Sequence, residues 1–92
     1  MEIISQLTAH SSQLTANNYQ LSAISYQLSV DSYIKLIVYD IAGREVSRLF
    51  DGFQPAGKHQ TTFDASGLPS GIYFVRLSAG NNIQTQKIAL VK

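Results

Sequence analysis

Cysteine is absent from the 92-residue chain, which excludes a disulfide, a thiolate metal site and a cysteine nucleophile. Charge is scarce as well, because charged residues make up 14% of the chain and the formal net charge is +1. The basic residues are spread out instead of forming the stripe that phosphate contacts need, which argues against a nucleic-acid partner. No apolar run approaches the roughly 20 residues of a membrane-spanning helix, so we expect no membrane span.

Candidate catalytic and metal-ligating residues are few and dispersed. His10 and His59 have no partner nearby in sequence, and the acidic residues are scattered. The stretch GLPSG, residues 67–71, precedes a predicted strand instead of a helix N-terminus and lacks the Gly-Lys-Ser/Thr ending of a phosphate loop. We therefore expect no enzyme, no metal site and no cofactor.

The most regular feature is a seven-residue unit that occurs four times near the N-terminus, as QLTAHSS, QLTANNY, QLSAISY and QLSVDSY. The leucine and the alanine or valine of each unit stand two apart, whereas a coiled-coil seam needs apolar positions three and four apart. Serine, threonine and asparagine also weaken helix interiors by competing for backbone hydrogen bonds. Three interpretations of residues 1–23 stay open: a low-complexity, poorly ordered tail, a loosely held helix, or additional strand.

From about Ile24 onward the chain is typical of short strands separated by turns. The segment YIKLIVYD, residues 33–40, alternates Ile34, Leu36 and Val38 with residues of the other face, which predicts a strand buried on one side and partly covered on the other. Further strands are expected at residues 44–50, 59–63, 72–77 and 83–92.

Turn residues separate these expected strands. The Asp-Gly pair at residues 51–52 is expected to close one strand, residues 53–59 to form a loop, and AGNN at residues 79–82 to form a tight hairpin connection. The segment IYFVRL, residues 72–77, is apolar on both faces except for Arg76, as in a central strand. Turn capping is the expected role of three aspartates: Asp40, Asp51 and Asp64.

The stretch DASGLPSG, residues 64–71, contains the densest turn chemistry of the chain. Asp64 is expected to accept hydrogen bonds from backbone amides just ahead, Gly67 to take a positive φ, Pro69 to lock its own φ, and Gly71 to permit close backbone approach. These residues predict a structural corner before the next strand. The strands and turns together predict one all-β domain, a small antiparallel β-sandwich with a low-complexity N-terminal extension.

Residues 24–92 resemble the C-terminal sorting domain of the type IX (Por) secretion system. Five segments match in order, namely VYDIAGREV, LFDG, PAGKH, FDASGLPSGIYFVRL and the closing KIALVK. The resemblance implies an immunoglobulin-like β-sandwich without catalytic activity at the C-terminus of a larger exported protein. It also implies that outer-membrane translocon proteins recognise the domain, and that the full-length protein is secreted or held at the cell surface.

Recognition through the terminal strand is the mechanism we expect for such a module, because exposed backbone at a strand edge accepts another strand without specific side chains. The candidate recognition residues belong to the closing segment: Lys87, Ile88, Leu90, Val91 and Lys92. The corner residues Asp64, Gly67, Pro69 and Gly71 are expected to maintain the fold. The sequence leaves the oligomeric state and the identity of the exported protein open.

Two features of the N-terminal part differ from the family. The Asn-Pro-rich segment that usually precedes the first strand is missing, and the Gln-Leu repeat stands in its place. The residues before the repeat show neither an exported domain nor the pattern of a signal peptide, so we expect the chain to be an orphan module or a fragment. The alternative is an immunoglobulin-like structural or adhesion module, similar to those of bacterial surface and flagellar hook-capping proteins.

Overall fold

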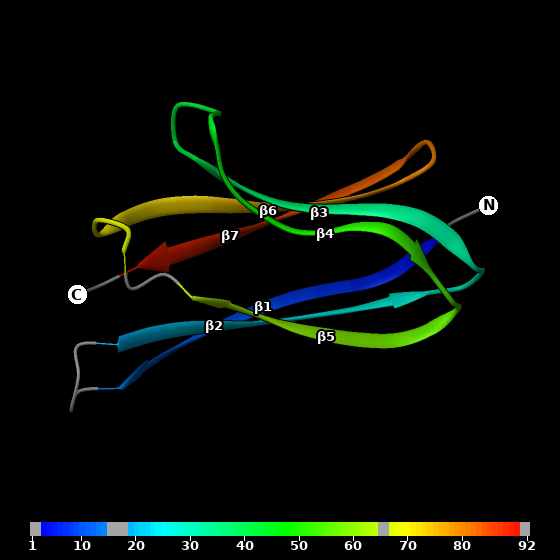
Figure 1. The fold of residues 1–92 in the computed structure, drawn as a ribbon, viewed down its shortest axis with the longest axis horizontal. Coiled ribbons are helices and arrows are strands. Elements are labelled where there is room, and N and C mark those ends of the chain that lie inside the picture. Colours follow the sequence, from blue (N-terminus) through cyan, green and yellow to red (C-terminus); the bar gives the residue numbers. More distant parts are fainter. Residues whose placement is uncertain (1–2, 15–18, 65–66, 91–92) are drawn as a thin grey trace.

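Seven β-strands form two antiparallel sheets in the computed structural model, which describes residues 3–14, 19–64 and 67–90. The strands are β1 (Ile4–Leu14), β2 (Tyr19–Leu28), β3 (Ser32–Asp40), β4 (Glu45–Gln54), β5 (Gly57–Asp64), β6 (Gly71–Ala79) and β7 (Asn82–Leu90). The order is β1-β2-β5 in the three-stranded sheet and β4-β3-β6-β7 in the four-stranded sheet. The two sheets face each other (Figure 1), which confirms the predicted β-sandwich.

The core lies between the two sheets and consists of side chains from alternate strand positions. In β3, Ile34, Leu36 and Val38 are fully buried, while Lys35 is exposed and Tyr39 half-buried. A strand presents successive side chains to opposite faces, so this alternation is the one that the sequence predicts. From the three-stranded sheet the core receives Ile4, Leu7, Ile24, Tyr26, Leu28 and Phe63.

Strand β6 lies between β3 and β7, as its apolar composition predicts. Its register with β7 is unbroken from Gly71, opposite Leu90, to Ala79, opposite Asn82. The Ala79–Asn82 pair encloses a two-residue connection in which Gly80 has a φ of 61°. A left-handed φ of this kind favours glycine, so the predicted hairpin is confirmed at AGNN.

Described residues of the Gln-Leu repeat form strands β1 and β2, which agrees with the third of the three interpretations, additional strand. The two strands pair as a hairpin in which Gln6 lies opposite Gln27 and Gln13 opposite Gln20. The backbone of β2 continues across residue 23, where the sequence suggested the end of a tail. β2 ends at Leu28, and residues 29–31 connect it to β3.

Three turn expectations are wrong. The Asp-Gly pair does not end a strand, because Asp51 lies opposite Lys35 and Gly52 opposite Ile34 within β4. The loop expected at residues 53–59 is mostly strand, because only residues 55–56 separate β4 from β5. The positive φ that we expected at Gly67 is absent, since the φ of this residue lies outside the left-handed region.

The buried face of β6 is expected to dominate the free energy of unfolding. Leu77 is fully buried, so Leu77→Ala should lower that free energy by about 2 to 5 kcal/mol through lost apolar contact and a residual cavity. Thr85→Ala, at an exposed position of β7, should change it by less than about 0.5 kcal/mol. Urea denaturation of both variants measures the difference, and equal midpoints would contradict the assigned core.

Candidate functional site

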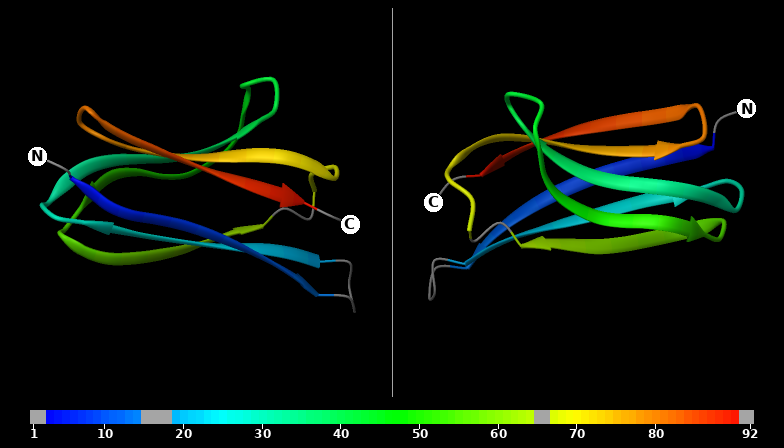
Figure 2. Two further views of the ribbon diagram at one scale, coloured as in Figure 1. Left: turned by 180° about the vertical axis from the view of Figure 1, so that it is seen from behind. Right: turned by 45° about the horizontal axis from the view of Figure 1, so that its top comes forward.

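The corner between β5 and β6 carries the chain from the three-stranded to the four-stranded sheet. Asp64 is the last residue of β5 and Gly71 the first of β6, with Gly67 and Pro69 between them (Figure 2). The predicted change of direction is therefore present. The backbone amides expected to bind Asp64 lie at residues 65–66, outside the described part of the chain.

Tyr73 holds this corner, a role that the sequence analysis missed because it placed the residue only within the apolar strand segment IYFVRL. Its ring is 5% exposed, and its phenol oxygen donates a hydrogen bond of 2.8 Å to the backbone carbonyl oxygen of Pro69. Immunoglobulin-like sandwiches use a similar arrangement, in which a tyrosine near the start of a strand binds backbone a few residues upstream. The sequence signal that could have revealed this role is the spacing of four residues between Pro69 and Tyr73.

Removal of this hydroxyl should destabilise the domain. Tyr73→Phe keeps the buried ring but leaves the Pro69 carbonyl without its donor, so we expect the free energy of unfolding to fall by about 1 kcal/mol. Tyr39→Phe is the matched control, because the Tyr39 hydroxyl has no hydrogen bond to any residue that the structure describes. Thermal unfolding compares the two, and equal losses would show that the corner bond contributes nothing.

β7 forms one edge of the four-stranded sheet, because it pairs with β6 on one side and with no described strand on the other. Two side chains bridge the first residues of β7 to the N-terminal end of β1. Asn82 accepts a 3.0 Å hydrogen bond from the backbone N–H of Ile3, just before β1, and Gln84 donates one of 3.1 Å to the Ile4 carbonyl. The stretch from Thr85 onward has no such bridge to a described residue.

The hairpin between β6 and β7 determines which backbone N–H and C=O groups of β7 point toward β6 and which point away from it. The pair that encloses a two-residue connection is hydrogen-bonded, and hydrogen-bonded pairs alternate with pairs whose backbone groups face outward. Because Ala79 and Asn82 form that enclosing pair, the backbone groups that face away from β6 belong to Ile83, Thr85, Lys87 and Ala89. The side chains of these four residues are also exposed. An added strand would therefore contact the backbone and the exposed side chains of the same residues.

The expected recognition residues do not share one environment. Lys87 is exposed, whereas Ile88 and Leu90 are 3% and 2% exposed and belong to the core. The period of two along the strand causes this division. Val91 and Lys92 lie outside the described residues. A role of these five residues in recognition stays a prediction.

The outer face of the four-stranded sheet has its charges divided between two halves. In the half formed by β3 and β4, Arg48 contacts Glu45 at 3.1 Å and Asp51 at 2.9 Å. At the turn that joins these two strands, Arg44 contacts Asp40 at 3.1 Å. The half formed by β6 and β7 has only basic charged residues, Arg76 and Lys87.

Hydrogen bonds lower the pKa of two carboxyl groups in the first half. The phenol of Tyr33 donates to Asp51 and is the main reason that the pKa of Asp51 lies below its usual value, while the same bond raises the pKa of Tyr33. The backbone N–H of Arg44 donates to the side chain of Asp40 at 2.9 Å and lowers the pKa of that carboxyl. Asp40 is therefore a turn cap as predicted, whereas Asp51 is a strand residue and that part of the prediction is wrong.

Tyr33→Phe should raise the pKa of Asp51 toward its usual value, because the phenol donor stabilises the charged carboxylate. The direction sets the pH window: the bond stabilises the folded state above the unfolded pKa of Asp51, and this stabilisation disappears as the pH falls through the lower folded pKa. Carboxyl carbon shifts in an NMR titration report the value. Tyr39→Phe should leave the Asp51 titration unchanged, and an unchanged titration in Tyr33→Phe would contradict the assignment.

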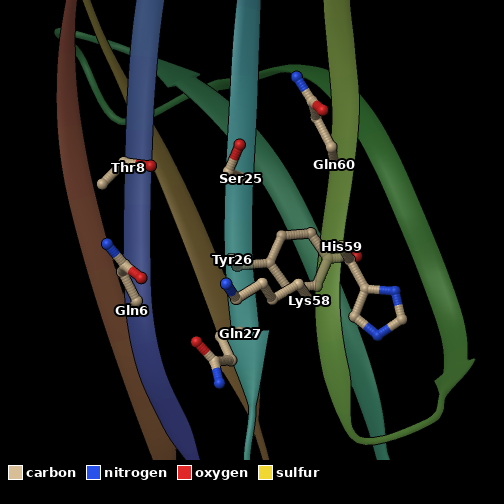
Figure 3. Close-up of a pocket in the computed structure, with 8 residues that line it drawn as sticks. All are labelled: Gln6, Thr8, Ser25, Tyr26, Gln27, Lys58, His59 and Gln60. Carbon is tan, nitrogen blue, oxygen red and sulfur yellow. The ribbon is translucent and has the colours of Figure 1, made fainter.

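An open hollow of about 350 Å³ lies on the three-stranded sheet (Figure 3). Its lining residues form two cross-strand rows, Gln6–Gln27–Lys58 and Thr8–Ser25–Gln60, beside Tyr26 and His59. The Lys58 side chain reaches from β5 toward Gln27 on β2. The ring of His59 stacks on Tyr26 with centroids 5.3 Å apart, and its Nε2 lies 2.7 Å from the Pro55 carbonyl oxygen. The hollow thus offers hydrogen-bonding groups and one cation, with no carboxylate among its lining residues.

Metal-ligating side chains do not gather in the described ranges, where no group of three or more histidine, cysteine, aspartate or glutamate residues occurs. The same part of the chain contains no helix of the length and apolarity that a membrane crossing requires.

Comparison with known proteins identifies the family of the chain. The family model described as secretion system C-terminal sorting domain matches residues 17–92, which include β2 to β7. No curated protein matches the chain. The match covers most of the chain and includes the corner, the central strand and the terminal edge strand described above. The chain therefore belongs to the family of secretion system C-terminal sorting domains, the sorting signals of type IX secretion.

Proposed function

We propose that this domain directs an exported protein to the outer-membrane translocon of the type IX system, and that the translocon binds it by adding a strand to the β7 edge. The single observation that supports strand addition at β7 is that this strand pairs with no described strand on its outer side. Strand addition obtains affinity from main-chain hydrogen bonds, which suits recognition of a segment with few specific side chains. The domain then acts by binding alone, without a reaction of its own.

The regularity of β7 supports this choice of edge. Natural sheets protect their edges with bulges, prolines and charges, because an unprotected edge is a template for another chain. β4 has two register shifts along β3 and β1 has one along β2, whereas β7 has none along β6 and contains a single charged residue, Lys87. β5 has an unbroken register with β2 as well, so it is the natural comparison in experiments.

The division between core and edge residues determines the design of a test. Deletion of KIALVK, residues 87–92, would remove the buried side chains of Ile88 and Leu90, so a loss of export would reflect unfolding. A substitution that changes only the outer side of β7 avoids this problem. Thr85 is suitable because its side chain is exposed and its backbone N–H faces away from β6 in the alternation set by the hairpin.

Thr85→Pro should abolish export while the domain stays folded. Proline removes one outward N–H and obstructs an added strand, and edge strands tolerate it where the N–H faces solvent. A signal peptide, a fluorescent reporter and residues 1–92 are fused in that order and expressed in a type IX-competent bacterium, and reporter outside the cell is measured. Thr85→Ala keeps the N–H and should be exported normally. Circular dichroism of both purified variants provides the folding control.

Export of Thr85→Pro at the level of Thr85→Ala would show that the β7 edge is not the recognised surface. Failure of the unsubstituted fusion to leave the cell would argue against sorting and in favour of an immunoglobulin-like structural or adhesion module.

A further inference from the structure

The unbridged part of β7, from Thr85 to Ala89, contains one charged residue, Lys87. In the register of the sheet, Lys87 lies opposite Phe74, Phe74 opposite Tyr39, and Tyr39 opposite Glu45. The first carboxylate in this row is therefore three strands away, about 14 Å at the usual strand spacing. That separation exceeds the Debye length of about 8 Å at physiological salt, so Glu45 does little to neutralise Lys87.

Arg76 adds to the positive charge of this half of the sheet. It lies opposite Thr85, and its guanidinium carbon stands 4.9 Å from the centre of the Tyr39 ring. A cation over an aromatic face is stabilised but keeps its charge. The three ion pairs among the described residues all involve Arg44 or Arg48, on the β3 and β4 side. Asp40 lines one hollow with Arg76 and Thr85, but its carboxylate is already paired with Arg44 at 3.1 Å, so the β7 edge keeps a positive charge.

This charge distribution disfavours a second copy of the chain as the occupant of the edge. Two β7 strands that pair antiparallel about a two-fold axis at Gln86, Lys87 or Ile88 would place two Lys87 side chains directly or diagonally opposite each other. Like charges at such positions destabilise a pair of strands, and opposite charges stabilise it. The same lysine that disfavours self-association therefore favours a strand with an acid at the facing position.

We propose that the partner strand added to β7 has an acidic residue opposite Lys87, and that this ion pair sets the register of the added strand. The inference rests on the proposed function, because it assigns a chemistry to the partner of the same edge. Ile83, 60% exposed, and Ala89 occupy alternate positions on the same side of β7, so apolar residues of the partner strand fit there. The partner is thus an alternating strand with apolar residues and one acid.

The test uses a nine-residue peptide of alternating threonine and valine with a central glutamate, and a twin with a central lysine. Each peptide is fused through a flexible glycine-serine linker to the C-terminus of residues 1–92, because tethering raises the effective concentration to the millimolar range. Amide hydrogen exchange by NMR then reports whether the outward N–H groups of Thr85 and Lys87 become protected. Exchange along β5 provides the comparison edge within the same molecule.

We expect the glutamate peptide to protect these amides about two- to fivefold more than the lysine peptide, the range expected for a favourable cross-strand charge pair. In Lys87→Glu the preference should reverse, and in Lys87→Gln it should disappear. Lys87 is exposed, so both variants are expected to fold, and their melting temperatures verify this. Salt at 1 M should reduce the preference, because the Debye length falls to about 3 Å.

The outcomes separate the two proposals. Equal protection by both peptides would overturn the acidic partner and leave strand addition at β7 standing. Protection with neither peptide, or along β5 only, would overturn strand addition at β7 itself. Concentration-dependent protection without any fused peptide would show that a second copy occupies the edge, which also overturns the inference.

Discussion

The position of β6 between β3 and β7 is the constraint on which the rest of the structure depends. Its inward residues are buried, and its two neighbours receive all of its main-chain pairing. The corner before it, held by the bond from Tyr73 to the Pro69 carbonyl, determines where β6 enters the four-stranded sheet. A domain of this size buries only about 60 to 65% of the surface of its unfolded chain, so a central strand has a large share in its stability.

The terminal strand has two roles because its two sides differ. Ile88 and Leu90 complete the core, while Thr85 and Lys87 present side chains and backbone groups at the open edge. An edge of this kind exists only when β7 is paired with β6. If a partner adds a strand there, it contacts a surface that the unfolded chain lacks, so recognition and folding are coupled through one element.

Much of this architecture was accessible from the sequence, and the exceptions have identifiable causes. The alternation of Ile34, Leu36 and Val38 and the apolar segment around Val75 predicted β3 and β6, because both patterns depend only on which faces are buried. The Asp51-Gly52 pair misled because its turn propensity is local, and pairing with β3 overrides it. The repeat was ambiguous because a strand of serine, threonine and glutamine has no distinctive pattern until it finds partners; β2 pairs with both β1 and β5.

Composition and spacing alone were enough to determine the class of the domain, the central position of β6 and the hairpin before β7. These follow from local rules about which side chains alternate and which residues turn. The tertiary structure decided which face of the terminal segment is core, which backbone groups are outward, and that Lys87 stands three strands away from the carboxylate in its row. Each of these depends on register between strands distant in sequence, and register is determined only when both sheets pack around a common core.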